Sequence, residues 1–227
     1  TAASSATAIA CYGGTSTVTV SASGGSPAYT GIGNFTVAAG SYNYTVTDTK
    51  GCTASTAVTV SQPAAFTMSI TASGPLTFCQ GGSVVLTAST ASGYTWSNGA
   101  TTASITVTSS GTYSVTGVNA SGCSATASGV SVTVNPSVTP TISISANPTG
   151  TISSTTSVTF SAVITNGGAS PVYQWKKNGL NVGTNAATYT NNAWVNGDAV
   201  TCTLTSNASC LTSSSATSNQ IALTVVT

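Results

Sequence analysis

Residues 40–52 read GSYNYTVTDTKGC, and residues 111–123 repeat the pattern as GTYSVTGVNASGC. In each copy a glycine precedes a run in which large apolar side chains alternate with hydroxyl side chains, and a turn then ends in Gly-Cys. Such period-two alternation is typical of a half-buried β-strand. A repeat that keeps strand, turn and cysteine in register predicts a structural module rather than a catalytic site.

The same alternation extends over the rest of the chain, and no helical period accompanies it. Gly, Asn and Ser interrupt the runs at the short spacing of a β-sandwich. Proline-containing joints at 61–64 and 135–140 each follow one strand-like run and precede another. We therefore predict an all-β protein of three tandem Ig-like β-sandwich domains arranged as an elongated rod, with boundaries at 1–63, 64–137 and 138–227.

Two tryptophans and two tyrosines support the Ig-like assignment. Trp96 and Trp175 each lie in a strand-like run that ends in Asn-Gly, where an Ig-like sandwich carries its buried core tryptophan. Tyr42 and Tyr113 follow a glycine at the start of a late strand, which resembles the tyrosine corner of that fold.

Charge is almost absent from this sequence. Among 227 residues the charged side chains are Lys50, Lys176, Lys177, Asp48 and Asp198, giving a net charge of +1. A nucleic-acid partner is excluded because it requires clustered Lys or Arg. A near-zero net charge favours self-association. No apolar run is long enough for membrane insertion, and stability should depend only weakly on salt and pH.

The sequence gives little indication of catalysis or of a bound cofactor or metal. The chain has no His, Glu or Arg, so general acid–base chemistry would rest on Asp48 and Asp198, which lie in different modules. We predict that both are turn-forming residues. A weak calcium site at one of them, a Ser–Lys dyad at Lys176 or Lys177, and an intramolecular Lys–Asn isopeptide bond beside Asp198 are the alternatives. We expect no enzyme activity and no bound cofactor or metal.

The six cysteines predict disulfides and an oxidising, extracytoplasmic compartment. Zinc is the rival interpretation, but the chain has no Cys-x-x-Cys pair and no His. Cys11 and Cys52 occupy places that match Cys79 and Cys123, which favours pairing within each module. The expected bonds are Cys11–Cys52, Cys79–Cys123 and Cys202–Cys210. The alternative is a Cys210 that bridges to another chain.

Trp194 lies in the stretch NAWVNGD at 192–198 and is the tryptophan most free to be exposed. It is our candidate for stacking against a sugar ring. Burial in the core is the competing and favoured interpretation, because large apolar side chains at strand ends are mostly buried.

Several motifs of the first module resemble a known family. They are Cys11-Tyr12-Gly13-Gly14, GGSPAY at 24–29, AGSY at 39–42 and a closing Gln62-Pro63. This module resembles the SprB-type repeat, named after a gliding-motility surface adhesin of Bacteroidota. The second and third modules, with WSNG at 96–99 and YQWKKNG at 173–179, are similar to the Ig-like modules found beside it. The resemblance implies a cell-surface adhesin and type IX secretion, and it supplies no catalytic residues.

The sequence thus predicts a secreted, non-enzymatic structural or adhesive protein of the cell surface. It would form a segment of an adhesin or the subunit of a self-assembling filament, a homo-oligomer built through β-strand or end-to-end contacts, with surface glycans as a further class of partner. The alternative is a carbohydrate-binding accessory region of a secreted enzyme.

Overall fold

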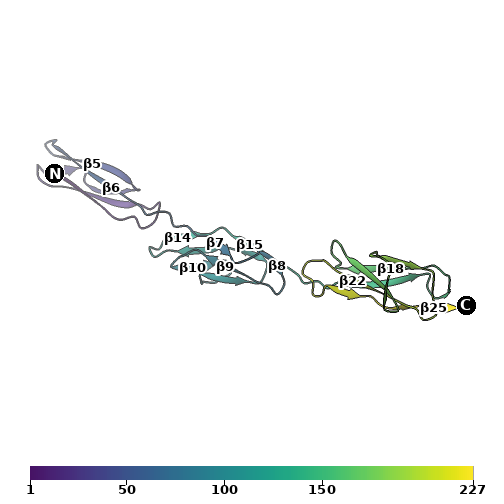
Figure 1. Cartoon of the computed structure of the whole chain (residues 1–227). Helices are drawn as coiled ribbons and strands as arrows, with labels where there is room; N and C mark the ends of the chain where they lie inside the picture. Colours follow the sequence, from purple (N-terminus) through teal and green to yellow (C-terminus); the bar gives the residue numbers. More distant parts are fainter. Residues whose placement is uncertain (227) are drawn as a thin grey trace. The chain divides into compact units, whose positions relative to one another are not determined.

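The computed structural model describes residues 1–226, which form β-strands and the turns and loops between them, with no helix among these residues. Alternating burial along the strands matches the alternation of the sequence. In β2 (Ser16–Ala22), for example, Val18 and Val20 are buried while Thr19 and Ser21 face solvent. The predicted all-β class and its tandem Ig-like sandwiches are confirmed (Figure 1).

The first sandwich has two antiparallel sheets. One sheet joins β1 (Ala2–Ala6), β2 and β4 (Gly33–Val37); the other joins β3 (Tyr29–Thr30), β5 (Gly40–Asp48) and β6 (Thr53–Val60). Its core contains Ile9, Val18, Val20, Val46 and Val60.

The second sandwich repeats this order of strands. One sheet joins β7 (Ile70–Ala72), β9 (Val84–Ala88) and β11 (Ser104–Val107); a second joins β10 (Gly93–Trp96), β13 (Val115–Val118) and β14 (Ser124–Thr126). A third joins β12 (Gly111–Tyr113), β15 (Val130–Asn135) and β8 (Thr77–Cys79), with β8 parallel to β15. Trp96 is buried here and donates from Nε1 to the carbonyl oxygen of Thr102 at 2.8 Å.

The third sandwich has the most extensive sheet. One sheet joins β16 (Thr141–Asn147), β18 (Val158–Thr165) and β21 (Thr188–Asn191); the other joins β19 (Val172–Lys177), β20 (Leu180–Val182), β22 (Ala199–Thr205), β23 (Ser215–Thr217) and β24 (Ile221–Ala222). β17 (Thr151–Ser153) lies parallel to β25 (Thr224–Val226). Trp175 is fully buried against Phe160 and Tyr189.

By its internal contacts the described chain separates into two compact units. One unit contains Thr1–Leu76 and Ser83–Val132; the other contains Thr77–Gly82 and the chain from Thr133 onward. The boundaries 1–63, 64–137 and 138–227 and the rod-like arrangement stay predictions.

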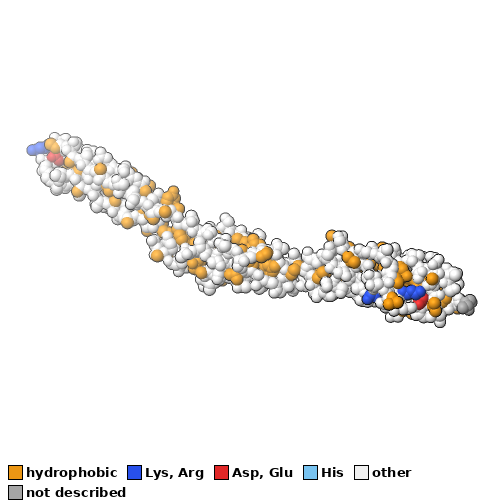
Figure 2. Space-filling view, in the orientation of Figure 1, with side chains coloured by type: hydrophobic (Ala, Val, Ile, Leu, Met, Phe, Trp, Pro, Cys, Tyr) orange, Lys and Arg blue, Asp and Glu red, His pale blue; other side chains and the backbone are white. Residues whose placement is uncertain are grey.

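Hydroxyl groups replace charges on the outer sheet faces. Neighbouring strands pair their side-chain oxygens across the ladder, as in Thr45–Ser55 at 3.0 Å and Thr116–Thr126 at 2.8 Å. Such cross-strand pairs stabilise a sheet without ionised groups. The space-filling view accordingly shows few charged side chains (Figure 2). Within residues 1–226 no helix is long and apolar enough to cross a membrane.

Candidate functional site

Two disulfides join parts of the chain that lie far apart in sequence. Cys11 bonds Cys123, with Cα atoms 5.6 Å apart, and Cys79 bonds Cys210, with Cα atoms 5.3 Å apart. Cys52 and Cys202 are free thiols. The expected pairs Cys11–Cys52, Cys79–Cys123 and Cys202–Cys210 are therefore all wrong.

The first of these pairs fails because its two cysteines lie near opposite ends of one sandwich. Cys11 precedes β2, whereas Cys52 lines a hollow together with Ala22, at the other end of that strand. A strand of seven residues spans about 20 Å at 3.3 Å per residue. A disulfide needs its Cα atoms within about 7 Å of each other.

The pair Cys202–Cys210 fails because the two side chains occupy different environments. Cys202 lies in β22 with no exposed surface, so its thiol belongs to the core of the third sandwich. Cys210 lies past the end of β22, in a turn, and bonds Cys79. The alternative in which Cys210 bridges to another chain is not the arrangement of this structure.

The Cys-x-Gly-Gly motif forms one half of each disulfide joint, which we call the cysteine corner (residues 11–14 and 79–82). The carbonyl oxygen of Cys11 accepts from the amide of Gly14 at 3.0 Å, and that of Cys79 accepts from Gly82 at 2.9 Å. Gly13 has a φ of 76°, in the left-handed region that glycine favours. The glycines therefore allow the backbone to turn back within four residues at each corner.

A turn closed by an Asx side chain forms the other half, which we call the cysteine turn (residues 48–52 and 119–123). Oδ1 of Asp48 accepts from the amides of Lys50 and Cys52, both at 2.9 Å. Oδ1 of Asn119 accepts from the equivalent amide of Cys123 at 2.9 Å. The turn-forming role predicted for Asp48 is confirmed.

Hydrogen bonds from backbone amides also set the ionisation of Asp48. The amide of Ser26 reaches its carboxylate at 3.1 Å, and with the amides of Cys52 and Lys50 it holds the pKa of Asp48 below its ordinary value. The carboxylate is thus a structural acceptor rather than a proton donor.

The third sandwich carries a shortened cysteine turn, which sequence reasoning missed. This turn lacks the Asx closure, because Oδ1 of Asn207 accepts instead from the amide of Ser170 at 3.1 Å. Residues 119–123 read NASGC and residues 207–210 read NASC, with the glycine deleted. Cys210 itself takes a positive φ of 59°, whereas Gly122 takes 81° in the longer turn. The shared Asn-Ala-Ser before a cysteine was the signal that relates Cys210 to Cys123.

Both disulfides therefore follow one rule: a cysteine corner bonds the cysteine turn of the next sandwich along the chain. At the first joint Cys11, Tyr12, Phe66 and Cys123 line a hollow of about 310 Å³. At the second joint the amide of Val138 donates to the carbonyl oxygen of Cys210 at 2.9 Å.

Asp198 forms a buried polar cluster in the third sandwich. It accepts from Nζ of Lys177 at 2.7 Å, from Nδ2 of Asn178 at 2.7 Å and from the amide of Val195 at 2.8 Å. Burial raises the pKa of Asp198, but the hydrogen bonds and the positive charge of Lys177 outweigh it and hold the pKa below its ordinary value. The cluster ties β19 to the 195–198 turn, in agreement with the predicted turn role of Asp198.

Trp194 belongs to the core of the third sandwich, with 3% of its surface exposed. Its ring meets Phe160 edge-on at 5.7 Å between centroids, and Nε1 donates to the carbonyl oxygen of Asn191 at 3.0 Å. The stacking role proposed for Trp194 is wrong, and the competing core interpretation is confirmed. The alternative function, carbohydrate binding, therefore no longer has the exposed aromatic side chain on which it depended.

Few side chains that could catalyse a reaction or bind a metal lie close together among residues 1–226. Within residues 1–226 no group of three or more His, Cys, Asp or Glu side chains lies close enough to hold a metal ion. Asp48 and Asp198 lie in different sandwiches, as the sequence indicated.

The site and the fold together define a tandem array of Ig-like β-sandwiches whose neighbours are disulfide-bonded. No protein-family model and no curated protein matches the chain. Among solved structures, the chain is similar to the three N-terminal domains of the highly immunogenic outer capsid protein of bacteriophage RB49, at 17% identity, over 99% of this chain and 100% of that one, with a TM-score of 0.39.

Two further structures show comparable likeness. The N-terminal four Ig domains of Dscam1 match at 17% identity over 82% of this chain and 55% of that one, with a TM-score of 0.34. The fibronectin(III)-like modules of Clostridium thermocellum CbhA match at 16% identity over 69% and 92%, with a TM-score of 0.30.

Proposed function

We propose that this protein is a non-enzymatic extracellular structural protein that carries tension along a surface adhesin or filament. The observation that carries the proposal is the interlocking of the two disulfides. Cys79 lies inside the loop closed by Cys11–Cys123, and Cys123 lies inside the loop closed by Cys79–Cys210. Neither bond staples a single module.

Interlocked loops shorten the covalent route through the chain. The shortest route runs from Thr1 to Cys11, crosses to Cys123, returns along the chain to Cys79, and crosses to Cys210 before it continues to the C-terminal strand. It includes about 70 residues, or about 250 Å at about 3.5 Å per residue. The fully reduced chain would reach about 790 Å. Pulling from the ends therefore loads disulfides before most of the hydrogen-bonded strands can be drawn out.

The chemical setting supports a place outside the cell. Disulfides persist in oxidising compartments. The outer faces are covered by paired hydroxyls instead of charges, so the sheets keep their side-chain contacts when salt or pH changes. These are properties that suit a stretch of exposed structural protein.

Single-molecule stretching from both termini tests the proposal. We expect the oxidised protein to reach a final contour of about 250 Å and the protein reduced with dithiothreitol to reach about 790 Å. Pairing within modules, as first expected, would give about 460 Å. An oxidised contour of 460 Å or more contradicts the proposal. Cys52→Ser is the matched control and should leave the oxidised length unchanged.

Self-association is the finer part of the proposal, with copies meeting through strand or end-to-end contacts at a bacterial surface. The near-zero net charge supports it, because little electrostatic repulsion opposes close packing. Electron microscopy of native material should show regular assemblies. Isolated monomers at high concentration contradict the filament and leave the adhesin segment.

A further inference from the structure

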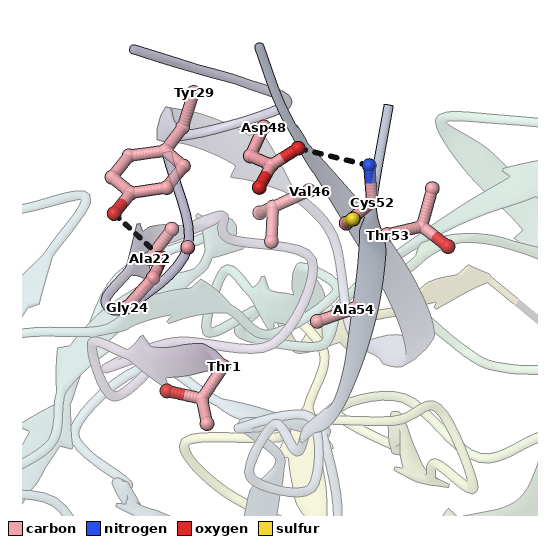
Figure 3. Close-up of a pocket in the computed structure, with 10 residues that line it drawn as sticks. Thr1, Ala22, Gly24, Tyr29, Val46, Asp48, Cys52, Thr53 and Ala54 are labelled. Atoms are coloured by element: carbon pink, nitrogen blue, oxygen red, sulfur yellow. Dashed lines mark hydrogen bonds between the residues drawn. The ribbon is translucent and has the colours of Figure 1, made fainter. Parts of the chain in front are cut away.

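Cys52 occupies a cysteine turn that is complete except for its disulfide. Its amide donates to Asp48 as that of Cys123 donates to Asn119, and in each turn the amide of the Asx residue donates to the carbonyl oxygen of the cysteine, at 3.0 and 2.9 Å. Cys123 is disulfide-bonded, whereas Cys52 is an exposed free thiol (Figure 3). The two turns differ in their bonding and not in their fold.

The disulfide-bonded cysteine turns of this same chain indicate which kind of cysteine would pair with Cys52. Cys123 and Cys210 both bond the cysteine of a Cys-x-Gly-Gly corner, contributed by Cys11 in one case and Cys79 in the other. The shortened turn of Cys210 still takes the same kind of partner. In this chain, therefore, each disulfide-bonded cysteine turn has the cysteine of a corner as its partner.

The surroundings of Cys52 resemble those of Cys123 in one respect. At the joint with Cys123, residues Ala65 and Phe66, which lead into the second sandwich, line the hollow beside the disulfide. Thr1, which leads into the first sandwich, lines the hollow beside Cys52 together with Tyr29, and this hollow measures about 90 Å³ (Figure 3). In both cases the cysteine turn lies at the end where the chain enters the sandwich.

A second copy of this chain has no free corner to offer. Cys11 and Cys79 are already bonded. In the third sandwich, the place of Cys79 is taken by Ser153: β17 runs parallel to β25 as β8 does to β15, and the amide of Thr156 donates to the carbonyl oxygen of Ser153 at 3.1 Å. The third corner thus keeps the turn but lacks the thiol.

We propose that Cys52 forms a disulfide with the cysteine of a Cys-x-Gly-Gly corner in a further Ig-like module that lies outside these 227 residues. Each thiol loses its proton, one Sγ–Sγ bond forms, and the two electrons reduce the S–S bond of a disulfide oxidant, which takes up the two protons and leaves as two thiols. The proposal rests on the proposed extracellular setting, since the bond requires an oxidising compartment.

Native material provides the direct test. The protein is isolated with free thiols alkylated before unfolding, digested without reduction and mapped by mass spectrometry. We expect the Cys52 peptide to be unalkylated and linked to a peptide that contains Cys-x-Gly-Gly. An alkylated Cys52, a Cys52–Cys52 link or a link to glutathione overturns the proposal.

The same map separates this inference from the proposed function. A free Cys52 beside intact Cys11–Cys123 and Cys79–Cys210 bonds refutes the inference and leaves the tension-bearing protein standing. Free thiols at all of these positions refute the extracellular function itself.

An engineered corner gives a second test with the purified protein. The variant Ser153→Cys with Thr155→Gly and Thr156→Gly supplies the missing thiol and the two glycines of the corner. Under oxidised glutathione we expect disulfide-linked head-to-tail oligomers in which position 153 of one chain is bonded to Cys52 of the next. On a non-reducing denaturing gel, wild type and the same variant carrying Cys52→Ser should show no disulfide-linked oligomers.

Peptide mapping decides the outcome for variant molecules that keep both native disulfides. Links from position 153 to Cys52 support the inference. Links between two 153 positions, links between two Cys52 positions, or the absence of any disulfide-linked oligomer contradict it, because each shows that a corner and this turn do not recognise one another.

Discussion

Nζ of Lys177 lies 2.7 Å from Oδ2 of Asp198 and 4.8 Å from the centroid of the Trp194 ring. The lysine therefore serves two partners from one position: it neutralises a buried carboxylate and covers the face of a core tryptophan. In a chain with so few charges, this ion pair concentrates electrostatic stabilisation in the third sandwich, where β19 meets the 195–198 turn.

Removing the carboxylate should destabilise the third sandwich. Asp198→Ala leaves Nδ2 of Asn178 and the amide of Val195 without their acceptor, and we expect a loss of about 2–4 kcal/mol in the free energy of unfolding. Urea unfolding of the whole chain, followed by tryptophan fluorescence, measures it. Lys176→Ala is the matched control. Lys176 is a half-buried lysine in the same strand as Lys177 that forms no ion pair with Asp198, and its loss should cost less than about 1 kcal/mol, the range of a surface charge. Equal losses in the two variants contradict this role of Asp198.

Acid should weaken the fold only below the ordinary range of carboxyl groups. The pKa of Asp198 in the folded protein is held below 3.8, so its ionised form stabilises the fold. That contribution is fully present above pH 3.8 and is lost as the pH falls through the lower folded value. We expect constant urea midpoints from pH 5 to 8 and a decline below pH 4 that Asp198→Asn reduces. A large change between pH 5 and 8 contradicts it.

The two free thiols should differ sharply in reactivity. Burial raises the pKa of Cys202 to about 11, whereas Cys52 is exposed. In the purified 227-residue protein, without the proposed partner module, iodoacetamide at pH 8.5 should therefore modify Cys52 in the folded state and reach Cys202 only after unfolding. Peptide mapping after timed alkylation measures both. Equal rates at the two positions would show that Cys202 is not sealed in the core.

The raised pKa of Cys202 also predicts an alkaline limit to stability. The neutral thiol stabilises the fold fully below the ordinary thiol pKa of 9.0, and this contribution is lost as the pH rises from there toward about 11. For each protein we compare the urea midpoint in that window with its own midpoint at pH 8. The midpoint of wild type should fall, and that of Cys202→Ala should fall less.

The strands and their corners could be predicted because local physics determines them. Period-two alternation identified the buried faces, and the Gly-x-Tyr motif identified the tyrosine corners. Oη of Tyr42 donates to the carbonyl oxygen of Ala38 at 3.0 Å, and Oη of Tyr113 donates to that of Ser109 at 3.1 Å. Each of these features spans only a few residues.

The cysteine partners could not be predicted in the same way. The repeat showed that Cys52 is equivalent to Cys123 in sequence, but this equivalence does not say which cysteines lie close enough to form a disulfide. That depends on which ends of successive sandwiches lie together, which is a long-range property of the fold. The positions of Cys11 and Cys52 near opposite ends of β2 were nevertheless open to a strand-length argument.

Loss of the Cys11–Cys123 bond should cost more stability than loss of the Cys52 thiol. The bond closes a sequence separation of 112 residues, and closure of a loop of about 100 residues is worth about 4.7 kcal/mol in the chain-entropy model. We expect Cys11→Ser with Cys123→Ser to lower the free energy of unfolding by about 3–5 kcal/mol, because the overlap with the Cys79–Cys210 loop already restricts the unfolded chain. Guanidinium unfolding of oxidised protein measures it, and Cys52→Ser should remain within about 0.5 kcal/mol of wild type.

Dithiothreitol should abolish the difference between the double variant and wild type, because reduction removes from wild type the bond that the double variant already lacks. A difference that persists after reduction would mean that the side chains at 11 and 123 stabilise the fold by packing and not by their bond.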